Sequence, residues 1–381
     1  MEKGKPVEIA IKSSLDGTDQ SNIIQVPADY DGSKPLPLLV GLHSWSADYK
    51  QQAKAMGPLA LKRGWLLVLP DFRGPNLPRN PKAKEACASI LAQHDVIDSV
   101  NYMIANFNVD KRRIYLTGGS GGGHMAHVMA AKYPDVWAGV SAWVSITNIA
   151  AWHGENKGYA PGVEACTGGK PGDSPEVDWE YFRRSPVNLI ANALNLPMDI
   201  HHGRNDQSVP YHHSVDSYNK LEDAGSAKAA LDVFDGGHDF KVGPAVDWLA
   251  KQVKDDAPPA RLDLTTDEAK SYYYAYLVPA EEMKPGRCDI SIREGKEVVV
   301  AADSLKELRL DWTAMAVGAK EVCLNVQKAT NPMTLRVENA AILEVECGKK
   351  IARTWEVDKQ KKVLTIAIDP AVAPVEYVLK F

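Results

Sequence analysis

Apolar residues along the first two thirds of the chain follow two alternating patterns. Some short runs are apolar almost throughout, and the segments between them repeat apolar residues at helical spacing, as Val96, Val100 and Met103 do. The predicted strands are EIAIKSS (8–14), NIIQVP (22–27), LPLLVGLH (36–43), WLLVLPD (65–71), RRIYLTG (112–118), WAGVSAWVSI (137–146), PMDIHHG (197–203) and ALDVFDGG (230–237). Strands that are apolar on both faces are typical of a parallel sheet covered by helices. We therefore expect a doubly wound, mostly parallel α/β domain at residues 1–256.

The pattern changes after DDAPPARLDL (255–264), where a Pro-Pro pair indicates a linker. Short strand-like runs follow at regular spacing, among them CDISIRE, EVVVAAD, EVCLNVQ and VLTIAID. Such spacing favours an antiparallel β-sandwich. We predict an all-β, sandwich-like accessory domain at residues 262–381, with a structural or packing role. Sugar binding through Trp312 and the tyrosines at 272–274 is the alternative.

Residues 150–182 interrupt the α/β rhythm with glycines, prolines and aromatic residues. A segment of this length without a regular pattern is typical of a functional loop or lid. It follows a predicted strand, at the sheet edge where open α/β folds bind ligands. We predict that Trp152 and Trp179 bind substrate there. The alternative is that residues 150–182 form a surface loop that lies far from any substrate.

The composition limits the classes of partner. The chain has 381 residues, of which 45% are hydrophobic, and its formal net charge is -5. A negative net charge gives no electrostatic reason to expect nucleic acid or an anionic membrane as a binding partner. No apolar run approaches the roughly 20 residues of a membrane span. The N-terminal segment has no signal-peptide apolar region, which leaves a cytoplasmic protein and a secreted one whose signal has been removed as alternatives. The oligomeric state stays open.

The cysteines and histidines are the residues that could form a disulfide or bind a metal. The five cysteines show no CxxC spacing, and buried free thiols are the expectation, with a Cys87–Cys166 bridge left open. The histidines occur at positions 124, 127, 201, 202, 212 and 213, among others. They are interpreted as packing, strand-end and helix-surface residues because no acidic or cysteine ligands cluster with them at familiar spacing. No metal and no cofactor is predicted.

Candidate chemistry begins at YLTGGSGGGHMA (115–126), which contains the G-x-S-x-G pattern around Ser120. The pattern follows a predicted strand and opens a predicted helix, which is the setting of a nucleophile elbow. A serine in that turn needs a strained backbone conformation, and neighbours with a Cβ would clash with the crossing helix and strand. Ser120 is therefore the predicted nucleophile, and the N–H of Gly121 is a predicted oxyanion donor.

A serine hydroxyl needs a base to remove its proton. Strand-end positions later in the chain supply Asp206, in HGRNDQSVP, and His238, in FDGGHDF, in the order serine, acid, histidine. We predict a hydrogen bond between Asp206 and His238, with His238 beside the Ser120 hydroxyl. Asp199, Asp235 and Asp239 are the competing carboxylates.

Together these motifs resemble the α/β-hydrolase superfamily, and within it the prolyl-oligopeptidase-like and acetyl-xylan or feruloyl esterase-like branch. The resemblance rests on HGRNDQSVP (202–210), DFRG (71–74) and NVDKRRIYLTGGSGGG (108–123), and covers residues up to about 255. In many relatives the loop after the first buried strand reads His-Gly-x, with the N–H of x as the second oxyanion donor. Here Ser44 replaces the glycine, so the resemblance assigns that donor to Trp45, whose ring would also border the substrate.

The resemblance implies two-step acyl transfer to water by Ser120, His238 and Asp206. We expect a serine esterase acting on a small-molecule or saccharide ester, with acetyl and feruloyl esters of carbohydrates as candidates. One alternative is a prolyl-oligopeptidase-like peptidase. Another is a non-catalytic binding protein on a hydrolase fold.

Overall fold

A computed structural model describes residues 2–348 and 354–381. The chain divides into two compact units, Met1–Lys254 and Asp255–Phe381. Each unit has a hydrophobic core of its own.

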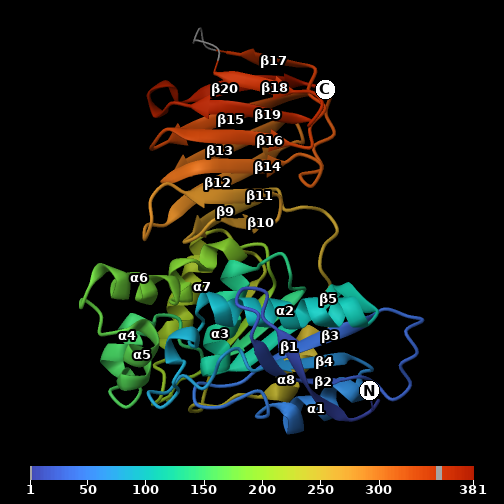
Figure 1. Ribbon diagram of the computed structural model, residues 1–381, viewed down its shortest axis with the longest axis vertical. Helices are drawn as coiled ribbons and strands as arrows, with labels where there is room; N and C mark the ends of the chain where they lie inside the picture. The colour runs from blue at the N-terminus through green and yellow to red at the C-terminus, as the bar shows by residue number, and fades with distance from the viewer. Residues whose placement is uncertain (1, 349–353) are drawn as a thin grey trace. The chain divides into compact units, whose positions relative to one another are not determined.

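The first unit is built on a sheet of eight strands in the order β1-β2-β4-β3-β5-β6-β7-β8 (Figure 1). The strands are β1 (Pro6–Lys12), β2 (Asp19–Gln25), β3 (Leu36–Leu42), β4 (Leu66–Pro70), β5 (Val109–Gly119), β6 (Gly139–Trp143), β7 (Met198–Gly203) and β8 (Ala229–Phe234). β2 pairs antiparallel with β1 and β4, and the pairs from β4 to β8 are parallel. The predicted mostly parallel α/β sheet is confirmed.

Helices cover both faces of this sheet. They are α1 (Ala53–Lys62), α2 (Ile90–Asn106), α3 (Gly121–Lys132), α7 (His212–Asp223) and α8 (Val242–Leu249), with short 3-10 turns η1 (Ala83–Glu85), η2 (Pro186–Asn188) and η3 (Ile190–Ala193). Alternate residues of a strand point to opposite faces. Leu38 and Val40 of β3 thus join the core beneath α2 and α3, whereas Leu39 joins the core beneath α1 and α8.

The segment 150–182 differs from the predicted irregular loop. It forms three short helices, α4 (Ile149–Glu155), α5 (Ala160–Thr167) and α6 (Pro175–Arg183). Asn148 caps the N–H groups of Ala150 and Ala151, and Ser174 caps that of Val177. Helices this short owe their stability to caps and tertiary packing, so their apolar periodicity is too brief to detect in the sequence.

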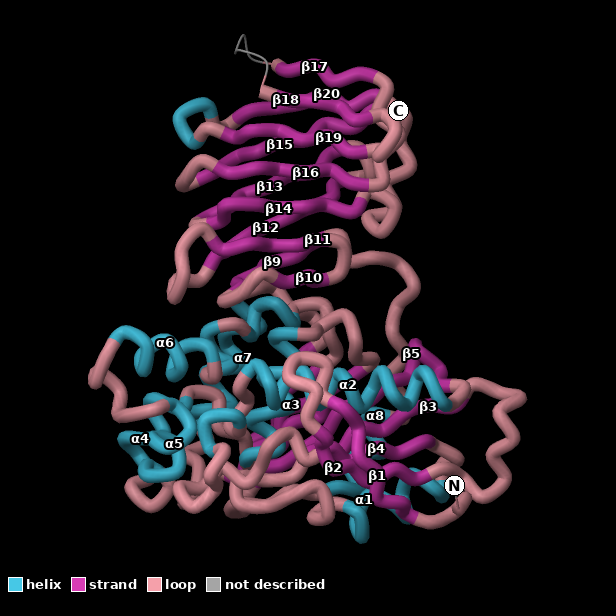
Figure 2. The backbone as a smooth tube through the Cα atoms, viewed as in Figure 1, coloured by secondary structure: helices cyan, strands magenta, loops and turns pink. Residues whose placement is uncertain are grey.

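The second unit contains two six-stranded sheets, β10-β11-β14-β16-β19-β18 and β17-β20-β15-β13-β12-β9 (Figure 2). Its strands are β9 (Arg261–Thr266), β10 (Lys270–Tyr272), β11 (Ala275–Pro279), β12 (Gly286–Arg293), β13 (Glu297–Asp303), β14 (Leu305–Asp311), β15 (Glu321–Ala329), β16 (Met333–Glu338), β17 (Glu344–Cys347), β18 (Trp355–Asp358), β19 (Val363–Ile368) and β20 (Val375–Lys380); η4 (Pro370–Val372) is a 3-10 turn. The all-β prediction is confirmed, but the sheets are mixed, because β13 pairs parallel with β15 and β14 with β16.

The five cysteines carry free thiols. Cys87 and Cys166 are both buried in the same hydrophobic cluster. Within the part of the chain that the structure describes, no helix has the length and apolar character needed to cross a membrane.

Candidate active site

Ser120 occupies a sharp turn between β5 and α3. Its φ of 58° and ψ of -120° lie in a region that side chains rarely adopt, and its N–H donates to the carbonyl of Trp143 at 2.9 Å. Glycines allow the crossing elements to approach: a Cβ on Gly118 would lie 2.6 Å from the backbone of Gly122, and one on Gly122 would lie 2.6 Å from the carbonyl oxygen of Leu42. The turn therefore has the geometry expected of a nucleophile elbow.

Asp206 lies in the loop after β7 with its side chain fully buried. One carboxylate oxygen, Oδ1, accepts the backbone N–H groups of Ser208 at 2.8 Å and Val209 at 3.0 Å. The other, Oδ2, faces two imidazole rings, those of His202 and His238. Burial alone would raise the pKa of Asp206, but the hydrogen bonds from His202, His238 and Val209 hold the pKa well below its ordinary value. The carboxylate is therefore ionised at neutral pH.

His238 lies in the loop after β8 and is the more exposed partner of this pair. Its Nδ1 is 2.6 Å from Asp206 Oδ2, so the predicted hydrogen bond between the two residues is present. Because a carboxylate only accepts, Nδ1 carries the proton, and the lone pair of neutral His238 is on Nε2. The loop packs on the elbow, since a Cβ on Gly119 would lie 2.6 Å from Phe240. The His238 side chain is 28% exposed, so solvent reaches it.

The competing carboxylates have other partners. Asp199 accepts from the Ser141 hydroxyl at 3.0 Å and lies 2.9 Å from His201 Nε2. Asp235 is exposed and lies 3.6 Å from Arg204. Neither arrangement involves His238.

Sequence reasoning missed His202, which it assigned to packing or a strand end. The ring is completely buried, and its Nε2 lies 3.2 Å from Asp206 Oδ2. The sequence did contain a signal: His202 lies four residues before Asp206, at the end of a strand. A side chain at that position can point back toward the turn that begins at Asp206.

The backbone of Trp45 lies against the start of α3. A Cβ on Gly121 would be 2.3 Å from Trp45 N and 2.5 Å from Trp45 Cα. Gly121 is the first residue of α3, where the N–H has no intrahelical acceptor. The Trp45 N–H likewise has no acceptor among residues 2–348 and 354–381. Two backbone N–H groups beside Ser120 are therefore free to bind an anion.

The aromatic residues of segment 150–182 are less exposed than expected. Trp152 is 2% exposed and meets the Trp45 ring edge-on at 4.7 Å between centroids. Its indole N–H donates to the carbonyl of Ser208 at 2.8 Å, next to Asp206. Trp179 stacks on Phe182 at 5.2 Å with its ring nearly parallel. Trp45 and Trp152 thus belong to one buried cluster, whereas Trp179 packs on its own helix.

Comparisons with known proteins address the family and the fold of the first unit. Residues 88–254 match the sequence profile of the prolyl oligopeptidase family. These matches support the α/β-hydrolase superfamily for the first unit and, within it, the prolyl-oligopeptidase-like and acetyl-xylan or feruloyl esterase-like branch. The predicted resemblance is thereby confirmed.

The matched proteins include esterases and peptidases. This chain is similar to feruloyl esterase B of Neurospora crassa (31% identity over 30% of this chain and 38% of that protein). It is also similar to an acetylxylan esterase of Coprinopsis cinerea (29% identity over 30% of each chain). The hydrolase unit shares its fold with Pyrococcus horikoshii acylaminoacyl peptidase (18% identity, TM-score 0.51, 64% of this chain and 39% of that one). The chain spans about a third of the length of the first curated relatives.

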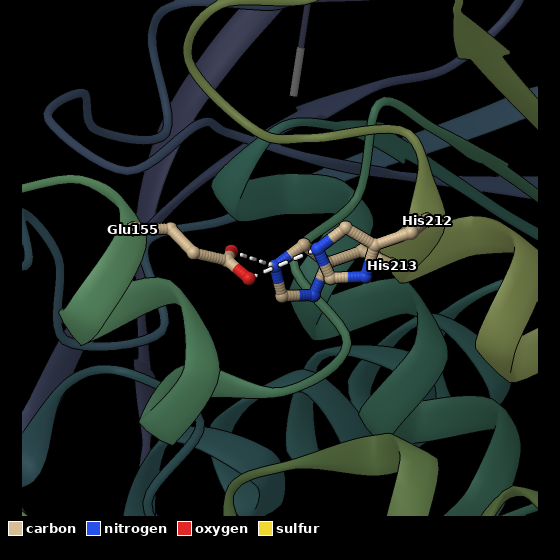
Figure 3. Close-up of side chains that lie close together, drawn as sticks. All are labelled: Glu155, His212 and His213. Atoms are coloured by element: carbon tan, nitrogen blue, oxygen red, sulfur yellow. Dashed lines mark hydrogen bonds and ion pairs between the residues drawn. The ribbon is translucent and has the colours of Figure 1, made fainter.

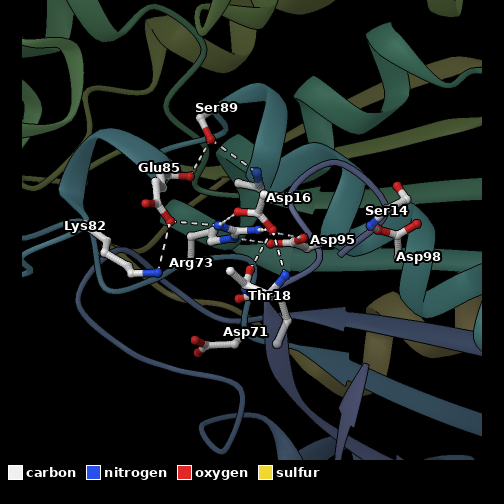
Figure 4. Close-up of polar contacts among 12 residues, drawn as sticks. Ser14, Asp16, Thr18, Asp71, Arg73, Lys82, Glu85, Ser89, Asp95 and Asp98 are labelled. Carbon is white, nitrogen blue, oxygen red and sulfur yellow. Dashed lines mark hydrogen bonds and ion pairs between the residues drawn. The ribbon is translucent and has the colours of Figure 1, made fainter. Parts of the chain in front are cut away.

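A buried arginine supports the loop that carries Trp45. Arg73 has a side chain that is 2% exposed, and it contacts Asp95 at 2.5 Å, Glu85 at 2.7 Å and Asp16 at 2.8 Å (Figure 4). Burial opposes the charge, but these hydrogen bonds raise the pKa of Arg73 above its ordinary value. The cluster joins α2, η1 and the β1–β2 turn to the DFRG segment of the hydrolase unit.

The DFRG segment in turn holds His43, two residues before Trp45. His43 Nε2 lies 2.6 Å from the carbonyl oxygen of Asp71, and its ring stacks on Phe72 at 3.9 Å. The carbonyl of Trp45 accepts the N–H of Asn76 at 2.8 Å. These contacts fix the backbone on both sides of the Trp45 N–H.

Among the residues that the structure describes, Glu155, His212 and His213 form the group that could hold a metal ion (Figure 3). Glu155 lies 2.9 Å from His212 Nε2 and 3.0 Å from His213 Nε2. However, His213 Nδ1 accepts the N–H groups of Thr147 and Asn148 at 3.3 Å, so its Nε2 carries the proton. A metal at Nε2 would need a proton on Nδ1, directly against those donors. The set fits a hydrogen-bonded link between α4 and α7 and does not fit a metal.

Proposed function

We propose that the hydrolase unit is a serine esterase that uses Ser120 as nucleophile, His238 as general base and Asp206 as its orienting carboxylate. The Asp206–His238 hydrogen bond of 2.6 Å carries the proposal. It fixes the tautomer that a base needs, and it stabilises the imidazolium that forms when Nε2 takes a proton. The strained turn at Ser120 supports the assignment of the nucleophile.

The reaction proceeds in two steps, acylation of Ser120 and hydrolysis of the acyl-enzyme. Ser120 Oγ attacks the ester carbonyl while its proton moves to His238 Nε2. The tetrahedral intermediate then expels the alcohol, which takes the proton from Nε2, and an acyl group remains on Oγ. Water attacks this acyl carbon and gives a proton to Nε2. The bond to Oγ breaks, Ser120 regains the proton, and the carboxylic acid leaves.

The N–H groups of Gly121 and Trp45 are proposed as the oxyanion hole. Both are backbone donors beside Ser120, and the close contact between the two residues supports their joint use. Backbone donors that need no reorganisation stabilise the negative charge of the tetrahedral intermediate. Ser44, where many relatives have glycine, still leaves the Trp45 N–H available, because that donor belongs to the next residue.

The substrate is proposed to be a carboxylic ester, with acetyl or feruloyl esters of carbohydrates as the candidates. The similarity to feruloyl and acetylxylan esterases supports this class. Trp45, Trp152 and Trp179 are the proposed substrate-binding aromatics. The two buried rings would form the rigid back of the pocket, and Trp179 would act from α6. The match to the prolyl oligopeptidase family supports the alternative substrate class, peptides.

A fluorophosphonate probe tests the nucleophile. We expect the native protein to be labelled stoichiometrically and Ser120→Ala to lose labelling and about 10⁴–10⁶-fold of kcat while remaining folded. Ser33→Ala, at an exposed turn, is the control and should label normally. Labelling that persists in Ser120→Ala would reject the nucleophile. A native protein that is never labelled would favour a non-catalytic binding protein.

A substrate panel then separates esterase from peptidase. The enzyme is assayed with p-nitrophenyl esters of small and bulky acids and with aminoacyl-anilides. We expect ester hydrolysis with higher kcat/KM than any anilide. Faster anilide cleavage, abolished by Ser120→Ala, would replace the esterase by the peptidase.

A further inference from the structure

His202 is the last residue but one of β7. Its ring is fully buried and both ring nitrogens have partners. Nε2 lies 2.9 Å from the carbonyl oxygen of Val209 and 3.2 Å from Asp206 Oδ2. Nδ1 lies 2.7 Å from the hydroxyl oxygen of Ser214 on α7. The ring thus contacts both ends of the turn from Asp206 to Val209 on its buried side.

The protonation pattern of His202 follows from these partners. Both groups at Nε2 are oxygen acceptors, so Nε2 carries a proton; it donates this proton to the carbonyl of Val209, and Asp206 Oδ2 lies 3.2 Å from the same nitrogen. In the neutral ring the lone pair is on Nδ1, and the Ser214 hydroxyl donates to it. Ser214 therefore holds the ring in the tautomer that points a donor at the carboxylate.

Asp206 Oδ2 consequently lies against two imidazole nitrogens that carry protons. His238 reaches it at 2.6 Å, and His202 reaches it at 3.2 Å from the buried side. Because Oδ1 is already bound to the N–H groups of Ser208 and Val209, the carboxylate cannot rotate without losing several hydrogen bonds. A buried carboxylate with donors on both oxygens keeps its charge and its direction.

We propose that His202 is a positioning residue for the reaction: its Nε2–H holds Asp206 Oδ2 in line with His238 Nδ1. The proposal rests on the proposed roles of Ser120, Asp206 and His238. It predicts an effect on kcat, since His202 acts through the carboxylate and does not reach the substrate. KM should change little.

Two substitutions distinguish the effect of the Nε2–H donor of His202 from the effect of losing the volume of its ring. His202→Gln keeps an amide N–H near the position of Nε2, whereas His202→Asn keeps a polar group only near Nδ1. We expect His202→Asn to lower kcat about 10–100-fold with KM within twofold, and His202→Gln to recover most of the loss. His201→Asn, one residue earlier on the same strand and bound to Asp199, is the control and should stay within about threefold of the native enzyme.

Two spectroscopic and kinetic readouts distinguish positioning from damage to the fold. The low-field proton NMR signal of the His238 Nδ1–H should weaken or shift in His202→Asn and persist in His202→Gln. The acid limb of kcat/KM should move to higher pH in His202→Asn, because the negative charge on Oδ2 is then less compensated and attracts the proton of His238 more strongly. Ser214→Ala should give a smaller loss of kcat in the same direction.

The proposal would be overturned by a folded His202→Asn with native kcat, or by a loss of kcat with an unchanged low-field signal and an unchanged acid limb. Equal losses in His202→Gln and His202→Asn would also overturn it, because the retained donor would then have no effect. Failure of the proposed function is recognised separately. In that case Ser120→Ala keeps probe labelling whatever the His202 variants do.

Discussion

At the scale of single residues, the site depends on backbone positions where a side chain would collide. Ser120 adopts a positive φ of 58°, and the glycines around it meet backbone atoms of other segments. Gly121 matters most of these for function, because the atom nearest to its Cβ position is the backbone nitrogen of Trp45, whose N–H is a proposed oxyanion donor. A methyl group there would meet backbone, which cannot rotate away as a side chain can.

Gly121→Ala is therefore expected to displace the Trp45 loop and lower kcat about 10²–10³-fold, the effect of losing one oxyanion donor. The Cβ would lie 2.3 Å from Trp45 N. The control is Gly243→Ala in α8, where a Cβ meets nothing within 4 Å. Steady-state kinetics on one ester checks both variants. Native kcat in Gly121→Ala would argue against Trp45 as a donor.

At the scale of elements, buried polar links hold the loops that carry the site. Arg73 joins three elements through carboxylates, and Glu155 joins α4 to α7. The Asp95 side chain is only 1% exposed, so its charge depends on Arg73 for compensation. A buried charge left without its partner destabilises far more than a lost surface pair does.

Arg73→Met should lower the free energy of unfolding by about 3–5 kcal/mol, because the methionine fills space but leaves buried Asp95 uncompensated. Urea unfolding measures the change. The matched control is Arg113→Met, which breaks a pair with Asp110 whose side chains are 39% and 21% exposed. That change should cost less than about 1 kcal/mol. Equal costs for the two variants would contradict the structural role of Arg73.

At the scale of the whole molecule, the two units differ in their histidine content. All 10 histidines lie before residue 255. Burial, the largest cause in each case, lowers the pKa of His124, His127 and His213 to about 4 from an ordinary 6.5. In the unfolded chain these rings take up protons near pH 6.5, whereas in the folded unit they do so only near pH 4. Their contribution to stability is complete above pH 6.5 and is lost as the pH falls toward 4.

We therefore expect the first unit to lose several kcal/mol of stability between pH 6.5 and 4, on the order of 3 kcal/mol for each buried ring. The second unit, which has no histidine, should change much less in this range. Heating the full chain with brief protease treatment, followed by mass spectrometry, reports the melting of each unit separately. Parallel loss of both units across this pH range would contradict the prediction.

The sequence by itself determined the succession of strands in the first unit, the elbow at Ser120 and the pairing of Asp206 with His238. Apolar runs, glycines and strand-end polar residues are local signals, and parallel strands bring their ends to one edge of the sheet. Only the tertiary structure decided the helices at 149–183, the parallel pairs in the second unit, the burial of Trp152 and the partners of the His202 ring. Each depends on contacts between distant segments. Short helices are stabilised by tertiary packing, and the pairing of strands depends on the whole sheet. The partners of a buried ring depend on the elements that enclose it.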